Sequence, residues 1–274
     1  MKRVLAINDI SCFGKCSLTV AIPIISAFGT EVCPLPTSLL SAHTGISGYY
    51  KFDLTEQMSK IYAHFKELNL NFDCVYSGYI PSLSGISVVS DILKDNKGKV
   101  LVVDPVMGDN GEAYQTHTFD ICDKICSLLN GATIITPNIT EAAIILHKPY
   151  PTNITSTSFF NSWLKELANL SEISIITGIL IGDNLYNVCY DRRSDEFFEY
   201  QTPKINAMVS GTGDIFTSCF TACFLNGKSI YNSLEISSLF VYQSILKTGI
   251  LNKNILDGIA FEPILKGGTF IEKV

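Results

Sequence analysis

The sequence predicts an α/β fold with three layers, in which helices cover both faces of a mostly parallel central sheet. Short apolar segments rich in β-branched residues, typical of buried strands, alternate with longer segments whose apolar residues recur at helical spacing. Late in the chain, two strand-like segments flank a polar turn and predict a small β-hairpin. We find no change of composition, repeat or low-complexity linker, so we expect one domain over residues 1–274.

The predicted strands are short and apolar. In chain order they are Val4–Ile7, Glu31–Pro36, Cys74–Ser77, Val100–Val103, Thr133–Ile135 and Ile173–Thr177, followed by the hairpin strands Leu185–Tyr190 and Phe197–Gln201.

The predicted helices carry apolar residues at helical spacing. They are Leu18–Phe28, Leu54–Leu68, Ile86–Leu93, Phe119–Leu129, Thr140–Leu146, Phe159–Leu170, Ile215–Leu225 and Tyr231–Lys247. Parallel strands joined by helical crossovers bring their carboxyl ends to one edge, where ligands bind.

Charge and hydropathy exclude several classes of partner. The net charge of −6 and the pI near 5.2 argue against nucleic acid or an anionic membrane surface as the main partner. No segment has the length of a membrane span, and Asp9 interrupts the first apolar run before it could form a secretory signal. We therefore expect a cytoplasmic protein.

The nine cysteines include three pairs spaced four residues apart, which on a helix would share a face. These pairs are Cys12/Cys16, Cys122/Cys126 and Cys219/Cys223. Their neighbours are apolar, and no histidine or second pair lies at a metal-site spacing. We interpret them as free thiols that pack as small hydrophobic groups in a reducing compartment.

The motif within Val209–Phe220 contains a glycine loop, Gly211-Thr212-Gly213, directly before Asp214 and a helical segment. Glycines allow close approach of the backbone to a ligand, and a helix N-terminus favours phosphate. A carboxylate there would repel phosphate unless it accepts a proton from the group that attacks the phosphate. The alternative is that Asp214 only stabilises the start of the helix, where acidic residues are common.

Polar residues follow the predicted strands and should meet at one edge of the sheet. They are Asp9, Tyr79, Asp104, Thr136, Asn138 and Thr177. Oxygen ligands such as Asp104, Asn138 and Glu141, directly or through water, suit Mg²⁺. Helix capping is the alternative for Asn138 and Glu141. Asp109 faces either the same pocket as Asp104 or the solvent.

The glycine loop, Asp214 and these polar residues together predict phosphoryl transfer. They offer an amide site for an anion, a base, and ligands for a hard cation, which are the components of that reaction. No Walker motif or protein-kinase glycine loop is present.

These motifs together resemble the ribokinase superfamily. They are Gly211-Thr212-Gly213-Asp214, the segment Asp104-Pro105-Val106-Met107-Gly108-Asp109 and Thr136-Pro137-Asn138. Within that superfamily, Ser41-Ala42-His43-Thr44-Gly45 and Ser77-Gly78-Tyr79 resemble segments of the pyridoxal (vitamin B6) kinases. The resemblance covers essentially the whole chain and implies the ribokinase-like fold, ATP as phosphate donor, a B6 vitamer as acceptor, Mg²⁺, a monovalent cation such as K⁺, and a homodimer.

The resemblance also implies roles for individual residues. Asp214 would be the base for the 5′-hydroxymethyl group, and the amides of Gly211, Thr212 and Gly213 would hold the transferring phosphate. Asp104, Asn138 and Glu141 would act with the metal and phosphates, and Thr136 and Thr177 would contact nucleotide phosphate or the monovalent cation. Asp109 would lie on a mobile flap, whereas Thr44 and Tyr79 would contact the pyridine ring. The adenine contacts would come from the segment around Lys204–Val209 and the last helices.

Asp9 departs from the family pattern, because many B6 kinases have serine at this position. Its carboxylate could pair with a protonated ring nitrogen or an amine of the substrate, or it could only stabilise the following turn. Two other functions remain open: a hydroxymethylpyrimidine kinase of thiamine synthesis, and a non-catalytic B6-binding protein. The presence of both Asp214 and Glu141 disfavours the second.

Overall fold

The computed structural model describes residues 1–206, 210–251 and 255–268 of the chain. Its main sheet has nine strands in the order β11-β10-β9-β8-β5-β4-β1-β2-β3. The strands are β1 Arg3–Ser11, β2 Glu31–Leu40, β3 Lys51–Asp53, β4 Cys74–Ser77, β5 Val100–Val103, β8 Ala132–Ile135, β9 Ser171–Ile181, β10 Asn184–Asp191 and β11 Glu196–Pro203. Strands β2, β1, β4, β5, β8 and β9 pair in parallel, whereas β3, β10 and β11 pair antiparallel to their neighbours.

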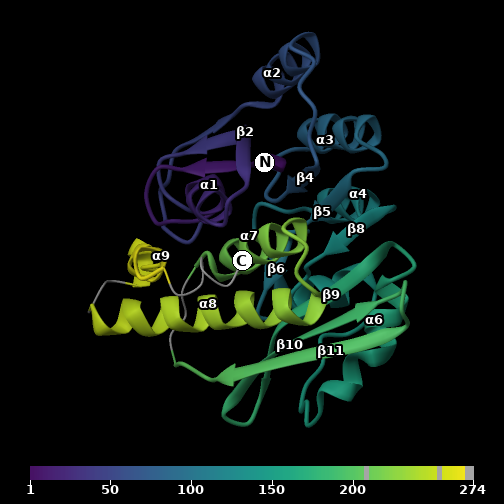
Figure 1. The fold of residues 1–274 in the computed structure, drawn as a ribbon, viewed down its shortest axis with the longest axis vertical. Helices are drawn as coiled ribbons and strands as arrows, with labels where there is room; N and C mark the ends of the chain where they lie inside the picture. Colours follow the sequence, from purple (N-terminus) through teal and green to yellow (C-terminus); the bar gives the residue numbers. More distant parts are fainter. Residues whose placement is uncertain (207–209, 252–254, 269–274) are drawn as a thin grey trace.

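Helices cover both faces of this sheet, as predicted (Figure 1). One layer comprises α1 Leu18–Ala27, α7 Thr212–Leu225, α8 Ile230–Ile250 and α9 Glu262–Lys266. The other comprises α2 Thr55–Glu67, α3 Leu83–Asp95, α4 Phe119–Leu128, α5 Ile139–Ile145, the short 3₁₀ helix Thr157–Phe160 and α6 Asn161–Leu167. Each layer encloses its own apolar core, and Trp163 is buried in the core of the second layer. A further 3₁₀ turn, Ile255–Asp257, precedes α9.

Three strands, β1, β2 and β9, extend four residues beyond their predicted carboxyl ends. β1 continues past Ile7 to Ser11, so Asp9 lies within the strand and not in a turn after it. β2 contains Pro34 and Pro36, which cannot donate to a ladder, yet it continues to Leu40. β3, the antiparallel neighbour of β2, pairs with residues 38–40, so the prolines leave that ladder intact. β9 likewise runs beyond Thr177 to Ile181.

A second sheet, which the sequence reading missed, forms the hairpin β6 Gly108–Asp109 and β7 Glu112–Ala113. Its turn residues Asn110 and Gly111 both have positive φ, at 52° and 85°, as a tight hairpin turn requires. Gly108 is required because a Cβ atom there would lie 2.4 Å from the carbonyl oxygen of Glu112. We refer to residues 108–117 as the flap, because the hairpin leads directly to His117.

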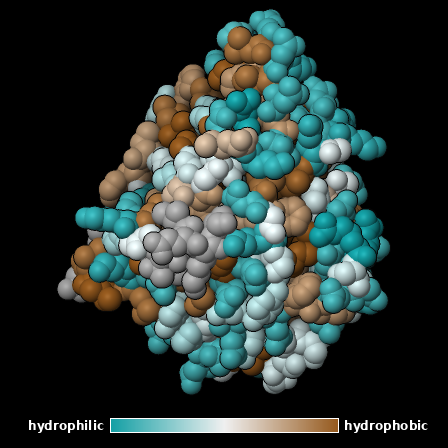
Figure 2. Space-filling view, in the orientation of Figure 1, coloured by the Kyte–Doolittle hydropathy of each residue, from teal (hydrophilic) through white to brown (hydrophobic). Residues whose placement is uncertain are grey.

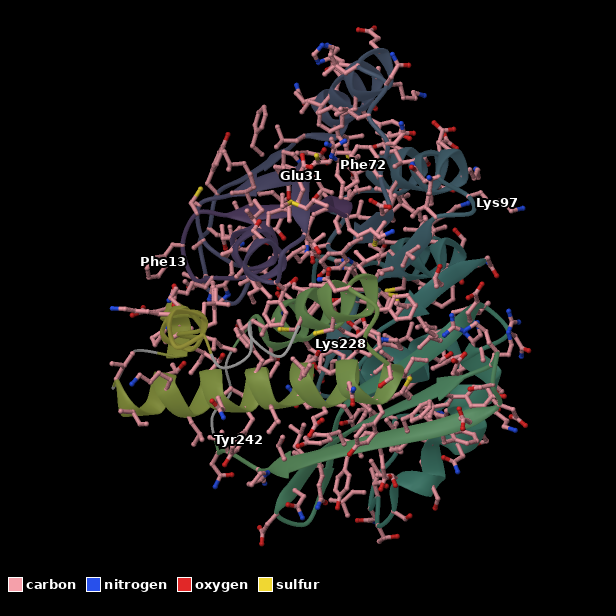
Figure 3. All side chains as sticks on the ribbon, in the orientation of Figure 1. Phe13, Glu31, Phe72, Lys97, Lys228 and Tyr242 are labelled. Carbon is pink, nitrogen blue, oxygen red and sulfur yellow. The ribbon has the colours of Figure 1, made fainter. Side chains whose placement is uncertain are left out.

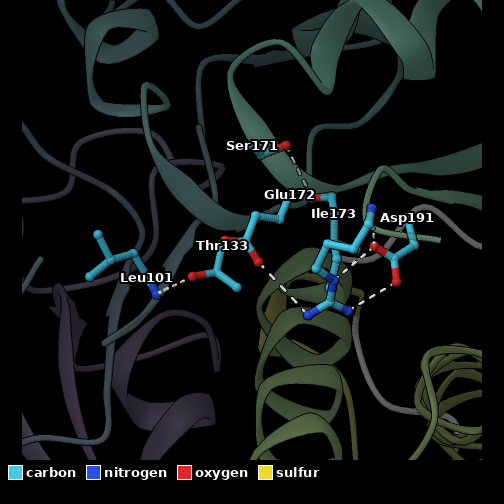
Figure 4. Close-up of polar contacts among 7 residues, drawn as sticks. Leu101, Thr133, Ser171, Glu172, Ile173 and Asp191 are labelled. Atoms are coloured by element: carbon cyan, nitrogen blue, oxygen red, sulfur yellow. Dashed lines mark hydrogen bonds and ion pairs between the residues drawn. The ribbon is translucent and has the colours of Figure 1, made fainter. Parts of the chain in front are cut away.

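Polar side chains at the amino ends of the strands satisfy one another and the backbone (Figure 4). The hydroxyl of Thr133 accepts a hydrogen bond from the backbone N–H of Leu101 at 3.0 Å. Arg193, in the β10–β11 turn, donates to the Asp191 carboxylate from two nitrogens, each at 2.9 Å. These contacts at this edge are structural, and the predicted site residues Asp104, Thr136 and Asn138 follow the opposite, carboxyl ends of β5 and β8.

Among the described residues, no helix combines the length and apolar composition needed to cross a bilayer. All nine cysteines are free, and five of them are buried. Cys12 is an exception to the predicted packing role, because it is exposed on the loop after β1.

Candidate active site

Asp214 lies in the first turn of α7, which begins at Thr212 and has Gly211 as its N-cap. The backbone N–H of Ser17 donates to one carboxylate oxygen of Asp214 at 2.8 Å, and the side-chain amide of Asn8 donates to the other at 3.2 Å. Asp214 is thus held by two donors from the N-terminal part of the chain, 197 and 206 residues away in sequence. Its carboxylate is fixed in position and is not a simple helix cap.

The pKa of Asp214 is raised to about 6, mainly because burial disfavours its charged form, and the nearby Asp9 raises it further. The two hydrogen bonds oppose this shift. The position of Asp214 at a helix N-terminus predicts a lowered pKa, because the helix dipole favours a negative charge there. That prediction is wrong, because burial raises the pKa. A carboxylate with a pKa near 6 is a stronger base than an ordinary aspartate and is still ionised at neutral pH.

The loop that presents Ser17 to Asp214 has an unusual backbone. Gly14, Lys15 and Ser17 all have positive φ, and Ser17 lies at φ 56° and ψ −131°. Residues other than glycine rarely adopt such angles, and where they do the surrounding structure must hold them there. Here the result is an amide directed at Asp214. Gly211, with φ 88°, packs so closely on this loop that a Cβ atom would lie 2.6 Å from the carbonyl oxygen of Lys15.

Asn8 connects the base to the expected substrate residues. It is buried in β1, and its side-chain oxygen accepts the backbone N–H groups of Asp9 at 3.0 Å and of Tyr79 at 2.8 Å. A Cβ atom on Gly78 would lie 2.3 Å from the Asn8 side-chain nitrogen, so only glycine fits there. The sequence reading missed Asn8, because a single asparagine in an apolar strand gives no signal of partners 71 and 206 residues away.

Asp104 is buried after β5, close to the glycine loop. A Cβ atom added to Gly213 would lie 3.9 Å from its carboxylate, which places the loop and Asp104 side by side as predicted. The hydroxyl of Thr217 lies 3.5 Å from Asp104 and donates to the Thr136 hydroxyl at 3.0 Å. Burial raises the pKa of Asp104 well above its usual range, and Glu141 and Asp214 raise it further.

Glu141 and Asn138 form a capping box at the start of α5. The carboxylate of Glu141 accepts the backbone N–H groups of Asn138 and Met107, and the side-chain amide of Asn138 donates to the carbonyl oxygen of Gly108. These bonds fix the Asp104–Gly108 loop to α5. Burial raises the pKa of Glu141 to about 7, although the backbone donors lower it. Capping and a role beside a metal are compatible, because each carboxylate oxygen has a second lone pair.

These acids fit a divalent cation as a group, although not as a closed cage. Within residues 1–206, 210–251 and 255–268, no three His, Cys, Asp or Glu side chains are arranged to ligate a metal. However, Glu141 and Asp214 raise the pKa of the buried Asp104, and a cation beside these carboxylates would relieve that repulsion. Mg²⁺ is commonly bound by one or two carboxylates, with water and phosphate oxygens as the remaining ligands.

The other predicted site residues occupy different surroundings. Thr177 is close to Asn138, because its backbone N–H donates to the carbonyl oxygen of Pro137. Asp109 is exposed on the flap, and its carboxylate accepts two hydrogen bonds from Asn110 in its own turn. The structure therefore does not place Asp109 against Asp104. Residues 207–209 of the expected adenine segment, including the first residue of the glycine motif, lie outside the described residues.

Asp9 is buried and accepts a hydrogen bond from the hydroxyl of Ser11 at 2.9 Å. Burial raises its pKa, whereas Ser17, Ser11 and His43 oppose the shift. Ser11 also lines a cavity of about 300 Å³ beside the Gly14 loop. Thr44 is exposed and follows His43, which is buried and accepts the backbone N–H of Gly45.

Tyr79 is buried, and its backbone N–H donates to Asn8. Burial raises the pKa of its phenol to about 12, so the phenol stays protonated at neutral pH and can act as a hydrogen-bond donor. The edge of the sheet therefore brings Asp9, Tyr79 and Asp214 together around Asn8, and Asp104 and Thr136 together around Thr217.

The chain resembles known proteins over most of its length. A family model described as phosphomethylpyrimidine kinase matches residues 25–257. A crystal structure of a Bacteroides thetaiotaomicron protein, provisionally named a phosphomethylpyrimidine kinase and solved with pyridoxal, is 34% identical with a TM-score of 0.93, covering 97% of this chain and 95% of that one. The crystal structure of pyridoxal kinase from Lactobacillus plantarum is 26% identical with a TM-score of 0.89, covering 97% and 96%. A Saccharomyces cerevisiae protein provisionally named a pyridoxal kinase is 26% identical over 272 residues, covering 92% of this chain and 83% of that one.

Proposed function

The chain belongs to the phosphomethylpyrimidine kinase family, and from that premise we propose that it transfers the terminal phosphoryl group of ATP to the 5′-hydroxymethyl group of a B6 vitamer. The observation that carries this proposal is the Asp214 carboxylate, fixed by Ser17 and Asn8 at the start of α7 with a pKa of about 6. A buried base beside an amide loop is what an acceptor hydroxyl and a phosphate require.

In the proposed reaction, the substrate hydroxyl oxygen forms a bond to the γ-phosphorus while the bond from that phosphorus to the ADP oxygen breaks. Asp214 accepts the hydroxyl proton. The amides of Gly211, Thr212 and Gly213 stabilise the negative charge on the transferring group. Mg²⁺, held through Asp104 and Glu141, directly or through water, would neutralise phosphate charge, and Thr136, Asn138 and Thr177 would face the nucleotide phosphates or a monovalent cation.

The acceptor is the part of this proposal that most needs an experiment. A B6 vitamer is favoured over hydroxymethylpyrimidine because a relative 34% identical was solved with pyridoxal. Hydroxymethylpyrimidine is the second candidate, because the family description, phosphomethylpyrimidine kinase, names a pyrimidine substrate. A coupled assay of ADP release with pyridoxal, hydroxymethylpyrimidine and ribose distinguishes them. Turnover of hydroxymethylpyrimidine alone would replace the proposed acceptor, and tight pyridoxal binding without turnover would indicate a carrier.

The same proposal includes a cytoplasmic homodimer. Apolar side chains are exposed at the β3 edge of the sheet: Leu39 and Phe52, which pair across β2 and β3, and Tyr50 at 68% exposure. Phe13, whose side chain points outward in Figure 3, is also exposed, and the preceding residue, Cys12, donates its N–H to the carbonyl oxygen of Leu40 at the end of β2. Figure 2 shows hydrophobic surface in this region, near β2. A second copy of the chain would cover such a patch.

The turnover number is expected to rise with pH through about 6 and to level off above it, because Asp214 must be ionised to accept a proton. At pH 5 about one tenth of the limiting rate should remain, given a pKa near 6. In Asn8→Ala the transition should move to higher pH, since Asn8 donates to the charged form.

The measurement is kcat at saturating substrates from pH 5 to pH 9. Asn226→Ala is the matched control, because Asn226 also makes side-chain hydrogen bonds but at the far end of α7. A transition that stays at the wild-type pH in Asn8→Ala would contradict the proposed contact between Asn8 and the base.

Asp9→Ser is expected to change the ranking of pyridoxal, pyridoxine and pyridoxamine by kcat/KM. A buried carboxylate is costly without a cationic partner, and pyridoxamine supplies an amine. We expect the variant to lose about tenfold on pyridoxamine relative to pyridoxal, the loss of one charge-assisted hydrogen bond. An unchanged ranking would mean that Asp9 serves only Ser11 and the local backbone.

A further inference from the structure

His117 is the only buried residue between Asp109 and Asp120, a segment that the structure describes completely. Its side chain is 7% exposed, whereas Phe119, two residues later, is 77% exposed. Burial of a polar ring in an otherwise exposed segment, while a larger apolar ring nearby stays in solvent, is the reverse of the usual preference. The surroundings of His117 must therefore account for its position.

The ring of His117 packs against Tyr79, with ring centroids 5.5 Å apart, and its other ring neighbour is Tyr114 at 6.1 Å. Its Nδ1 atom pairs with the Thr116 hydroxyl at 3.0 Å, and Nε2 is buried with no partner among the described residues. Burial lowers the pKa of His117 to about 4, so the ring is neutral at physiological pH. His117 therefore acts as a flat, uncharged ring that packs against the tyrosine proposed to contact the pyridine substrate.

The backbone joins this ring firmly to the flap hairpin. The N–H of Tyr114 donates to the carbonyl oxygen of Met107 at 2.9 Å, and the N–H of His117 donates to that of Tyr114 at 2.8 Å. A displacement of β7 must therefore also move His117. Through Asn8, Tyr79 is in turn connected to Asp214.

The underside of the flap is not fully packed. The tip is held by a hydrogen bond from the N–H of Gly111 to the Thr140 hydroxyl at 2.9 Å and by Tyr150, whose ring a Cβ on Gly111 would approach to 3.4 Å. A cavity of about 440 Å³ lies between the flap, α4 and α5, and His117 forms part of its wall. Space beside a segment with few contacts allows it to shift as a unit.

We propose that His117 is a positioning residue that couples the two substrate sites: contact of the flap with nucleotide phosphates sets the position of His117, and His117 sets the Tyr79 ring against the acceptor. This inference rests on the proposed function: Asn138, which is proposed to face the nucleotide phosphates, donates to the carbonyl oxygen of Gly108 in the flap, and Tyr79 is expected to face the vitamer. It adds that each substrate binds more tightly when the other is present, and that the His117–Tyr79 contact carries this effect.

The experiment is calorimetric titration of pyridoxine with and without AMP-PNP and Mg²⁺. Pyridoxine is chosen because it has no aldehyde that reacts with lysines. For the wild type we expect AMP-PNP to tighten pyridoxine binding at least fivefold, the lower end of typical coupling between sites. In His117→Ala the ratio of the two Kd values should fall to about one. His117→Phe keeps a ring against Tyr79 and should retain the wild-type ratio of the two Kd values. Phe119→Ala, on the same segment, is the control and should also retain it.

A structural role alone would weaken pyridoxine binding equally with and without AMP-PNP, leaving the ratio at its wild-type value in His117→Ala. That result, or a wild-type ratio of one, would overturn the inference. If His117→Ala does not fold, His117→Gln removes the ring while keeping a polar side chain. The ratio of its two pyridoxine Kd values should also fall to about one. If pyridoxine does not bind the wild type at all, the proposed acceptor is wrong, and the same ratio measured with hydroxymethylpyrimidine still tests the coupling.

Discussion

Asp214→Asn is expected to lower kcat by about 10²–10⁴-fold, the usual contribution of a general base, while ATP binding stays close to that of the wild type. The side-chain oxygen of the asparagine can still accept the N–H of Ser17, so the Gly14 loop keeps its position. What is lost is the ability to take the proton of the acceptor hydroxyl. The amides at the start of α7 remain available to phosphate, which is why binding should survive.

The same substitution should stabilise the fold near neutral pH. The folded-state pKa of Asp214, about 6, lies above the ordinary value, so the folded protein binds more protons than the unfolded chain between about pH 4 and 6. Stability therefore falls as pH rises through this window, and above it the full cost of the buried charge is present. Removing that charge should raise Tm at pH 8 and leave it little changed at pH 4.

Single-turnover kinetics, nucleotide titration and thermal unfolding of one preparation test these expectations together. Asp120→Asn is the matched control, because Asp120 also lies in the first turn of a helix, α4, but is exposed there. A variant with near-normal turnover would refute Asp214 as the base. A large loss of both turnover and Tm would instead indicate that Asp214 mainly supports the fold.

The architecture could be predicted from the sequence because the alternation of buried strands and amphipathic helices is a local property. The ends of the strands were harder to predict. Asp9 and Ser11 interrupt the apolar pattern of β1, but their side chains satisfy each other by hydrogen bonding, so the strand continues. β6 and β7 have two residues each, too short for any periodicity, although Asn110-Gly111 is a recognisable hairpin turn.

The site could be predicted only in part, for a different reason. Acids after strands share one edge in any parallel sheet, so the proximity of Asp104 to the Gly213 loop follows from topology alone. The partners of Asp214 do not follow from topology. Asn8 and the Ser17 amide reach it through a backbone conformation that no residue type encodes by itself. The direction of the pKa shift also depends on burial, which three-dimensional packing decides.

Gly211→Ala is expected to lower kcat at least 10²-fold, because it disturbs the amide site and the base together. Gly211 has φ 88°, where an L-residue costs about 1–2 kcal/mol. In addition its Cβ would lie 2.6 Å from the carbonyl oxygen of Lys15, so either the start of α7 or the strained Gly14–Ser17 loop must move. Either movement lengthens the 2.8 Å contact between Ser17 and Asp214.

Gly227→Ala separates the backbone strain caused by an added methyl group from the effect of its close contact with a neighbour. Gly227 follows the other end of α7 with φ 83°, but nothing lies within 4 Å of its Cβ position. It should therefore show a similar loss of Tm from backbone strain while keeping wild-type kcat. If Gly211→Ala matches Gly227→Ala in both stability and turnover, the close approach of Gly211 to the Lys15 carbonyl has no catalytic role. A loss of turnover confined to Gly211→Ala would show that glycine is needed there because the backbone that holds the base occupies the space of a side chain.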